Sequence, residues 1–211
     1  MQDDIGEAER TPHPAAAQSA PGDEAKIRYD ERVAAEPGLR SNLPMTAKYH
    51  LAQCNVGRAK AAMDDPVMAG FAARLEDINA LADGAPGFVW RLQTESGNAT
   101  SVQAFADRLI LFNMSVWESP DHLRAFVYRS DHANVMKQRR SWFEKFDGLY
   151  LVLWWIPAGH IPDVAEARER LAHLQQRGES AHAFSFARIF PSPDHTAELP
   201  RVDLSDPCPA V

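Results

Sequence analysis

The sequence has little cysteine, no long apolar run and no excess of positive charge. Cys54 and Cys208 are the only cysteines among 211 residues, so a disulfide framework is not indicated and a reducing compartment fits. No apolar run approaches the roughly 20 residues that a membrane-spanning helix needs. The acidic start lacks the basic and apolar regions of a signal peptide. These absences predict a soluble, cytoplasmic protein with no membrane partner.

The charge balance and the missing motifs disfavour several classes of function. A formal net charge of -7 argues against nucleic acid or an anionic membrane as the main partner, because both reward a basic face. A basic run at Lys137, Arg139 and Arg140 is more typical of the solvated face of a helix. Metal-site spacings and the Gly-x-Ser-x-Gly, P-loop and dinucleotide fingerprints are absent, so no metal site, hydrolase or nucleotide-dependent function is indicated.

Composition divides the chain into one folded domain between two tails. Residues 1–43 are rich in Ala, Pro, Asp and Glu and have few large apolar groups, which predicts a disordered N-terminal tail. Residues 191–211 are rich in proline and predict an irregular C-terminal tail. Residues 44–190 are long enough for one well-buried core, and therefore for a single domain.

Within this domain, apolar patterns with the periods of strands and helices alternate. The predicted strands cover residues 48–56, 87–94, 109–117, 149–156 and 183–190. Predicted helices follow the capping sequences Asp65-Pro66, Ser119-Pro120 and Asp163. The first helix is expected to run unbroken to Gly84, the second to break near Arg129, and the third to end at Gly178. The resulting order is that of the ferredoxin-like split βαβ plan, an α+β sandwich with an antiparallel sheet.

The first and third strands, which are central in this plan, bring polar side chains together. Since strand side chains alternate, Gln53 and Asn55 share one face of the first strand, and Asn113, Ser115 and Trp117 share one face of the third. Buried amides must find partners, so such a cluster predicts a pocket for a ligand or water. A polar ladder that satisfies itself, or a wet dimer interface, explains the same pattern.

Aromatic and titratable residues near this cluster are further candidates. Alternation puts Phe88 and Trp90 on one face of the second strand, and Trp90 is expected to form an apolar wall of the pocket together with Trp117. Trp142, on the second piece of the second helix, is another substrate-binding candidate. His132 stands at the expected helix break and is suited to act as a general base near neutral pH, although a lone histidine is more often a capping or structural residue.

At Val116–Ser119, followed by Leu123, Phe126 and Ser130–His132, the chain resembles the antibiotic biosynthesis monooxygenase superfamily, whose members are dimeric α/β barrels. A closer resemblance, from about His50 to Phe190, is to the bacterial family named domain of unknown function 3291. The strings that carry it are Tyr49–Gly57, Gly87–Leu92, Asn113–Ser119 and Trp154–His160.

The superfamily resemblance implies a homodimer in which two sheets pack together, with a pocket in each subunit between sheet and helices. Members include cofactor-free oxygenases of polycyclic phenols, haem-degrading monooxygenases and proteins without demonstrated chemistry. The haem-degrading members use an Asn and a Trp at the positions of Asn55 and Trp117. Their iron-binding His falls one helical turn past His132, at Met136, so no cofactor is expected unless His132 or a loop His replaces it.

The sequence therefore predicts a small-molecule enzyme, an oxidoreductase similar to these monooxygenases, that acts on an aromatic or polyketide-like substrate. The catalytic candidates are His132, Asn113 and Asn55, and the substrate-binding candidates are Trp117, Trp90, Gln53, Ser115 and Trp142. Two alternatives stay open, because the fold alone does not choose a reaction. One is a dimeric ligand-binding protein without turnover, which would tolerate the loss of His132, and the other is a haem-binding or haem-degrading protein.

Overall fold

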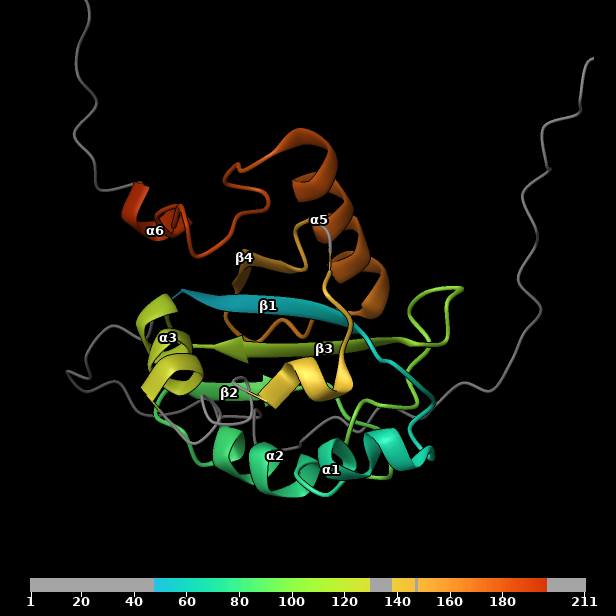
Figure 1. The fold of residues 1–211 in the computed structure, drawn as a ribbon. Coiled ribbons are helices and arrows are strands. Elements are labelled where there is room, and N and C mark those ends of the chain that lie inside the picture. Colours follow the sequence, from blue (N-terminus) through green and yellow to red (C-terminus); the bar gives the residue numbers. More distant parts are fainter. Residues whose placement is uncertain (1–47, 130–137, 147, 197–211) are drawn as a thin grey trace, which may run out of the picture.

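The computed structural model describes residues 48–129, 138–146 and 148–196, which form an α+β fold around one four-stranded antiparallel sheet (Figure 1). The strands are β1 (Tyr49–Arg58), β2 (Phe88–Arg91), β3 (Ile110–Trp117) and β4 (Leu151–Pro157). They lie in the order β2-β3-β1-β4, so β1 and β3 are the two central strands, as predicted. The described part of the chain forms an open sheet and no barrel.

The helices begin where capping residues predicted them. Asp65, Ser119 and Asp163 each accept a backbone N–H of the first turn, at distances between 2.7 and 3.3 Å. They open η2 (Pro66–Met68), α3 (Pro120–Arg129) and α5 (Val164–Arg177), and α5 ends at Gly178 as expected. A short helix, α6 (Pro193–Thr196), lies in the expected C-terminal tail, whereas residues 1–43 fall outside the described ranges. No helix in those ranges is long and apolar enough to cross a membrane.

The first predicted helix is broken, so the expectation of one continuous helix up to Gly84 is wrong. It consists of η2, α1 (Ala69–Ala72) and α2 (Leu75–Asp83). At the break the N–H of Arg74 donates to the carbonyl of Phe71 at 3.0 Å, a three-residue spacing that tightens the turn. Gly70 lets this backbone approach Trp142, because a Cβ there would lie 3.2 Å from the indole nitrogen. Apolar periodicity records which side chains face the core and does not reveal such a turn.

A β-bulge in β2 corrects the predicted faces of that strand. Phe88 pairs with Trp117 of β3, but Trp90 pairs with Val116, its neighbour, so the alternation shifts between Phe88 and Trp90. Phe88 consequently packs edge-on against Trp117, with 5.4 Å between ring centroids. Trp90 packs on the opposite face of the sheet, and the expectation that the two rings share a face is wrong.

The last predicted strand, residues 183–190, does not form. Phe184 makes one isolated bridge to Leu153 of β4, with hydrogen bonds of 2.7 and 2.9 Å. A second bridge, between Ser185 and Arg188, turns the chain back on itself before the pairing can extend. The bridge still fixes Phe184, which is fully buried, against the edge of the sheet.

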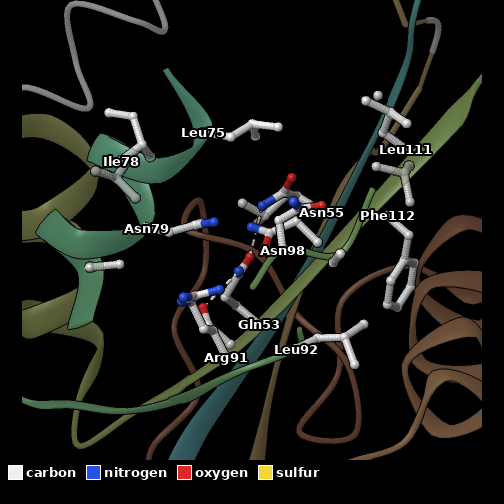
Figure 2. Close-up of a pocket in the computed structure, with 18 of the residues that line it drawn as sticks. Gln53, Asn55, Leu75, Ile78, Asn79, Arg91, Leu92, Asn98, Leu111 and Phe112 are labelled. Atoms are coloured by element: carbon white, nitrogen blue, oxygen red, sulfur yellow. Dashed lines mark hydrogen bonds between the residues drawn. The ribbon is translucent and has the colours of Figure 1, made fainter. Parts of the chain in front are cut away.

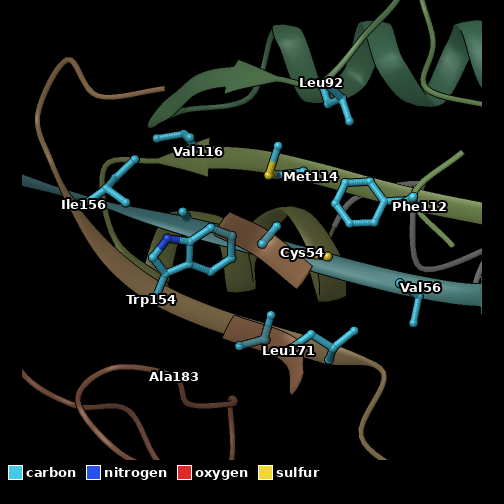
Figure 3. Packing of buried hydrophobic residues seen from close by; sticks show 14 of the residues in the cluster. Cys54, Val56, Leu92, Phe112, Met114, Val116, Trp154, Ile156, Leu171 and Ala183 are labelled. Carbon is cyan, nitrogen blue, oxygen red and sulfur yellow. The ribbon is translucent and has the colours of Figure 1, made fainter. Parts of the chain in front are cut away.

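One face of the sheet, here the α5 face, is covered by the chain itself. Cys54, Met114 and Trp154 are fully buried there and belong to one cluster with Leu171 and Leu174 of α5 (Figure 3). We expected a homodimer in which two sheets pack together, and such packing needs a bare apolar face. This face is not bare, because the appended α5 covers it. The homodimer stays a prediction, and its interface would have to use another surface.

The other face, here the cavity face, lies against α1, α2, α3 and the helical residues 138–142. Trp117 is held between Phe88 and Phe126, and its ring stacks on that of Phe126 at 5.1 Å. At the other end of this face, Phe71 meets Phe143 edge-on at 5.0 Å and lies 5.9 Å from Trp142. Two aromatic clusters therefore hold the helices to the sheet, and the space between the clusters is left open.

Candidate functional site

The open space is a cavity of about 620 Å³ between the cavity face and the helices. Its floor is formed by β1 and β3, its cover by α1 and α2, and its ends by α3 and the residues 138–143. Figure 2 shows Leu75 and Asn79 projecting from α2 toward Gln53 and Asn55 of β1. The volume falls within the range of about 300–1,000 Å³ that is usual for small-molecule pockets.

The floor of the cavity carries a chain of hydrogen bonds between side chains. In the register of β1 and β3, Gln53 lies opposite Ser115, as the predicted shared face requires. Asn55 Nδ2 donates to Gln53 Oε1 at 3.1 Å, and Gln53 Nε2 donates to Ser115 Oγ at 2.8 Å. Trp117 Nε1 donates to the same Oγ at 2.9 Å. Ser115 thus accepts two hydrogen bonds, which leaves its hydroxyl proton as the group still able to donate.

Asn113 continues this floor without joining the chain. It lies opposite Asn55 in the sheet, and its side chain is exposed to the cavity and makes no hydrogen bond with any other described residue. A primary amide offers both donors and an acceptor. Asn113 and the Ser115 hydroxyl are therefore the polar groups of the floor that remain available to a ligand.

Six of the eight predicted site residues line the cavity: Gln53, Asn55, Asn113, Ser115, Trp117 and Trp142. Trp90 does not, because the bulge in β2 buries it on the α5 face, where its indole N–H has no partner among the described residues. The expectation that Trp90 forms a wall of the pocket is therefore wrong. His132 lies outside the described residues. The roles assigned to these residues stay predictions.

The structure adds lining residues that sequence reasoning did not single out. Asn79 follows Leu75 by one helical turn and adds an amide to the apolar side of α2, a signal visible in the sequence. Arg139 was interpreted as part of a solvated helix face. It is half-buried instead, with its guanidinium 4.9 Å from the ring centre of Tyr150.

The described lining holds positive charge alone. Its charged side chains are Arg74, Arg91 and Arg139, and no Asp, Glu, Lys or His of the described residues is among them. Cys54 adjoins the floor in sequence but points to the α5 face, where burial raises the pKa of its thiol. A protonated, buried thiol is no nucleophile for this cavity.

A separate group of side chains near α5 has the composition of a metal site. Ligand atoms of Glu169, His173 and His182 lie within 4.8 Å of one another. They are already bonded, however: His182 Nε2 lies 2.9 Å from Glu169, and His173 Nε2 lies 3.2 Å from the hydroxyl of Ser180. The Arg170 guanidinium donates to Nδ1 of His182, so Nε2 carries the proton of the neutral ring and donates it to Glu169. A network that joins α5 to the following loop accounts for the cluster.

Fold and site together define an α+β protein with a cavity between one face of its antiparallel sheet and the covering helices. The model of the family described as domain of unknown function DUF3291 matches residues 50–200, and the chain belongs to this family. The sequence matches no curated protein. A crystal structure of a protein of unknown function from Nitrosomonas europaea aligns with a TM-score of 0.36 at 14% identity, covering 55% of this chain and 97% of that chain.

Proposed function

We propose that the protein binds a small, largely aromatic molecule in the cavity above Asn113 and Ser115. The observation that carries the proposal is the cavity itself, about 620 Å³ in size, with aromatic walls and a polar floor. Protein interiors are packed at the density of organic crystals and leave few voids larger than a water molecule. The core residues of the α5 face are almost completely buried, whereas the large open space adjoins the other face of the sheet. An opening of this size on the other face is the shape of a binding site.

The hydrogen bonds of the polar floor favour a bound ligand over a ladder in which every polar group is bonded within the protein. In a self-satisfied ladder each amide and hydroxyl would be bonded within the protein. Here the chain from Asn55 through Gln53 stops at Ser115, and the amide of Asn113 has no bond to a described residue. A ligand with a carbonyl or phenol oxygen would accept hydrogen bonds from the Ser115 hydroxyl and the Asn113 amide.

Turnover of the ligand, in a monooxygenase-like reaction, is the enzymatic form of this proposal. Amide donors on a rigid sheet could stabilise negative charge that develops on a substrate oxygen, as Asn55 and Asn113 would. We propose His132, which lies outside the described residues, as the proton acceptor, since the described lining has no His, Asp or Glu. If the protein is an enzyme, loss of His132 should abolish oxygen consumption with an aromatic substrate. If it only binds a ligand, loss of His132 should leave the affinity for that ligand unchanged.

Haem does not fit the described part of the cavity. A haem-degrading protein of this kind would need an iron-binding His, and the described lining contains no His, Cys or Met. We therefore derive no step through haem.

For the assembly, we propose a ferredoxin-like split βαβ subunit, in line with the strand order, that forms a homodimer without using the α5 face.

Replacement of Asn113 by Leu tests the binding site. Because the Asn113 amide has no bond to lose within the described residues, Asn113→Leu should change the free energy of unfolding by less than about 0.5 kcal/mol. Affinity for aromatic ligands should fall, because the floor loses its free amide. Chemical denaturation and titrations followed by tryptophan fluorescence measure the two effects. A loss of stability of about 1–3 kcal/mol with unchanged ligand response would make Asn113 a structural residue and sink the proposal.

Two tryptophan variants provide a matched control for this titration. Trp117→Phe removes an indole that lines the cavity and bonds to Ser115, whereas Trp90→Phe removes a buried indole on the α5 face. Both changes remove similar volume from a buried position. Trp117→Phe should weaken aromatic ligands and Trp90→Phe should not. Equal effects of the two substitutions would mean that general loosening, and not the cavity wall, determines binding.

A further inference from the structure

We infer that the ligand of the cavity is a monoanionic acid, an apolar aromatic body that carries one carboxylate. The inference rests on the proposed function, since it requires that the cavity binds a ligand. It starts from a contrast in charge. The whole chain has 29 acidic and 22 basic residues, yet the described lining has three arginines and no acidic residue. The described lining of an acidic protein therefore offers only positive charge to the molecule in the cavity.

One of the three arginines is bonded within the protein through all three nitrogens of its guanidinium. Arg91 Nε and Nη2 donate to the two carboxylate oxygens of Asp83 at 2.7 and 3.1 Å. Its Nη1 donates to the carbonyl oxygen of Gly97 at 2.8 Å. A guanidinium clamped in this way ties β2 to the end of α2 and has its charge balanced. Arg91 shapes the cavity, but it is not the group that would bind an anion.

The other two arginines have no acidic partner among the described residues. Arg74 donates to the carbonyl oxygen of Gly70 at 2.5 Å, and its guanidinium lies 5.3 Å from the ring centre of Trp142. Arg139, one helical turn before Trp142, lies over Tyr150. Both side chains are half-buried. Each guanidinium has five N–H donors, so most of the donors are left over at the Trp142 end of the cavity.

A carboxylate satisfies this end of the cavity better than a neutral or a doubly charged group. The planar guanidinium matches a carboxylate in a bidentate pair, and partial burial strengthens the attraction. The walls beyond the arginines are aromatic and aliphatic, which suits an apolar ring system and makes a dianion costly to desolvate. Stacking of both guanidinium groups on aromatic rings holds them in place before a ligand arrives.

The test compares two probes of the same shape, anthracene-2-carboxylate and anthracene-2-carboxamide, by calorimetry on the full chain near neutral pH. The carboxylate should bind at least about tenfold more tightly than the amide, and the difference should shrink as salt is added. Arg74→Gln and Arg139→Gln should each reduce this preference, and the double variant should bring it within about twofold, with amide binding retained. Arg168→Gln is the matched control, because Arg168 also lies over an aromatic ring, Phe105, but does not line the cavity.

The outcomes separate this inference from the proposed function. If the two probes bind with equal affinity, or if the double variant keeps the full preference for the carboxylate, the anionic ligand is wrong and the cavity remains a binding site for neutral molecules. If a naphthyl phosphate binds more tightly than the carboxylate, the inference that the ligand carries a single negative charge is wrong. If neither anthracene probe binds, the proposed function fails and this inference fails with it.

Discussion

Gly87 occupies a position where no other residue fits. Its φ of 72° lies in the left-handed region, and a Cβ there would lie 2.0 Å from Nδ1 of His122. Its carbonyl oxygen accepts the N–H of Glu118 at 2.8 Å, which fixes the approach of β2 to the start of α3. The His122 ring in turn lies 3.2 Å from the hydroxyl of Ser119, the cap of α3. One glycine thus sets the distance between a strand and the helix that closes the cavity.

Gly87→Ala should therefore destabilise the protein more than the equivalent change at Gly97. Gly97 also has a positive φ, of 80°, but no atom lies within 4 Å of the Cβ that alanine would add. The conformational cost alone is about 1–2 kcal/mol, and Gly97→Ala should show little beyond it. Gly87→Ala adds the clash with His122 and should exceed that value. Urea denaturation measures both, and equal losses would show that His122 moves aside freely.

His50 predicts a pH dependence of stability. Burial lowers its pKa from 6.5, and nearby Glu118 opposes the shift only in part. Because the folded state disfavours the charged ring, the contribution of His50 to stability is fully present above about pH 6.5 and is lost as the pH falls through the lowered folded pKa. The free energy of unfolding should therefore fall less steeply between about pH 7.5 and 5 in His50→Gln than in the wild type.

The matched variant for this measurement is His195→Gln, since the side chain of His195 is 79% exposed. At pH 7.5 its free energy of unfolding should match that of the wild type, because a substitution at an exposed position has little effect on stability. If His50→Gln keeps the wild-type slope, protonation of His50 does not oppose folding, and the folded protein accommodates the charged form of this half-buried ring, whose Nδ1 has no hydrogen-bond partner among the described residues.

At the scale of single elements, local patterns predicted the strands and helix starts but not their irregularities. Alternation along β1 and β3 correctly predicted that Gln53 and Asn55 share one face of the first strand and that Asn113 and Ser115 share one face of the third, because the period of a strand depends only on neighbouring residues. The same rule put Trp90 on the wrong face. A bulge is a feature of the pairing between two strands, so the sequence of one strand does not reveal it. The close approach of Gly70 to Trp142, just before the break of the first helix, likewise joins segments that lie far apart in the sequence.

The same limit explains which parts of the cavity were predicted. The floor follows from strand alternation and from the central positions of β1 and β3, so Asn55 and Asn113 were found. Arg139 was missed because a basic run normally indicates a solvated face. Arg139 lies half-buried over the ring of Tyr150 in the folded protein. The pattern of charges along the sequence does not reveal that contact.

At the scale of the whole molecule, α5 decides what kind of surface the protein presents. Without it, the apolar face around Cys54, Val152 and Trp154 would be uncovered, and a large exposed apolar patch favours association. The cap at Asp163 and the amphipathic pattern up to Gly178 predicted α5, but the face that it covers could not be deduced, because the apolar side of an amphipathic helix fits either face. The structure places α5 where a partner subunit was expected.

Detaching α5 should therefore turn the protein into a self-associating one. Leu171→Glu combined with Leu174→Glu puts two charges where α5 contacts the sheet, and these charges cannot stay buried without partners. Light scattering should show a larger assembly than for the wild type, and binding of a dye that reports exposed apolar surface should rise. Ala165→Glu with Gln176→Glu adds the same charges to exposed positions of α5 and should match the wild type. If the leucine variant keeps the wild-type mass and dye binding, the sheet does not need α5 as its cover, and a partner subunit on this face becomes the better explanation of its apolar residues.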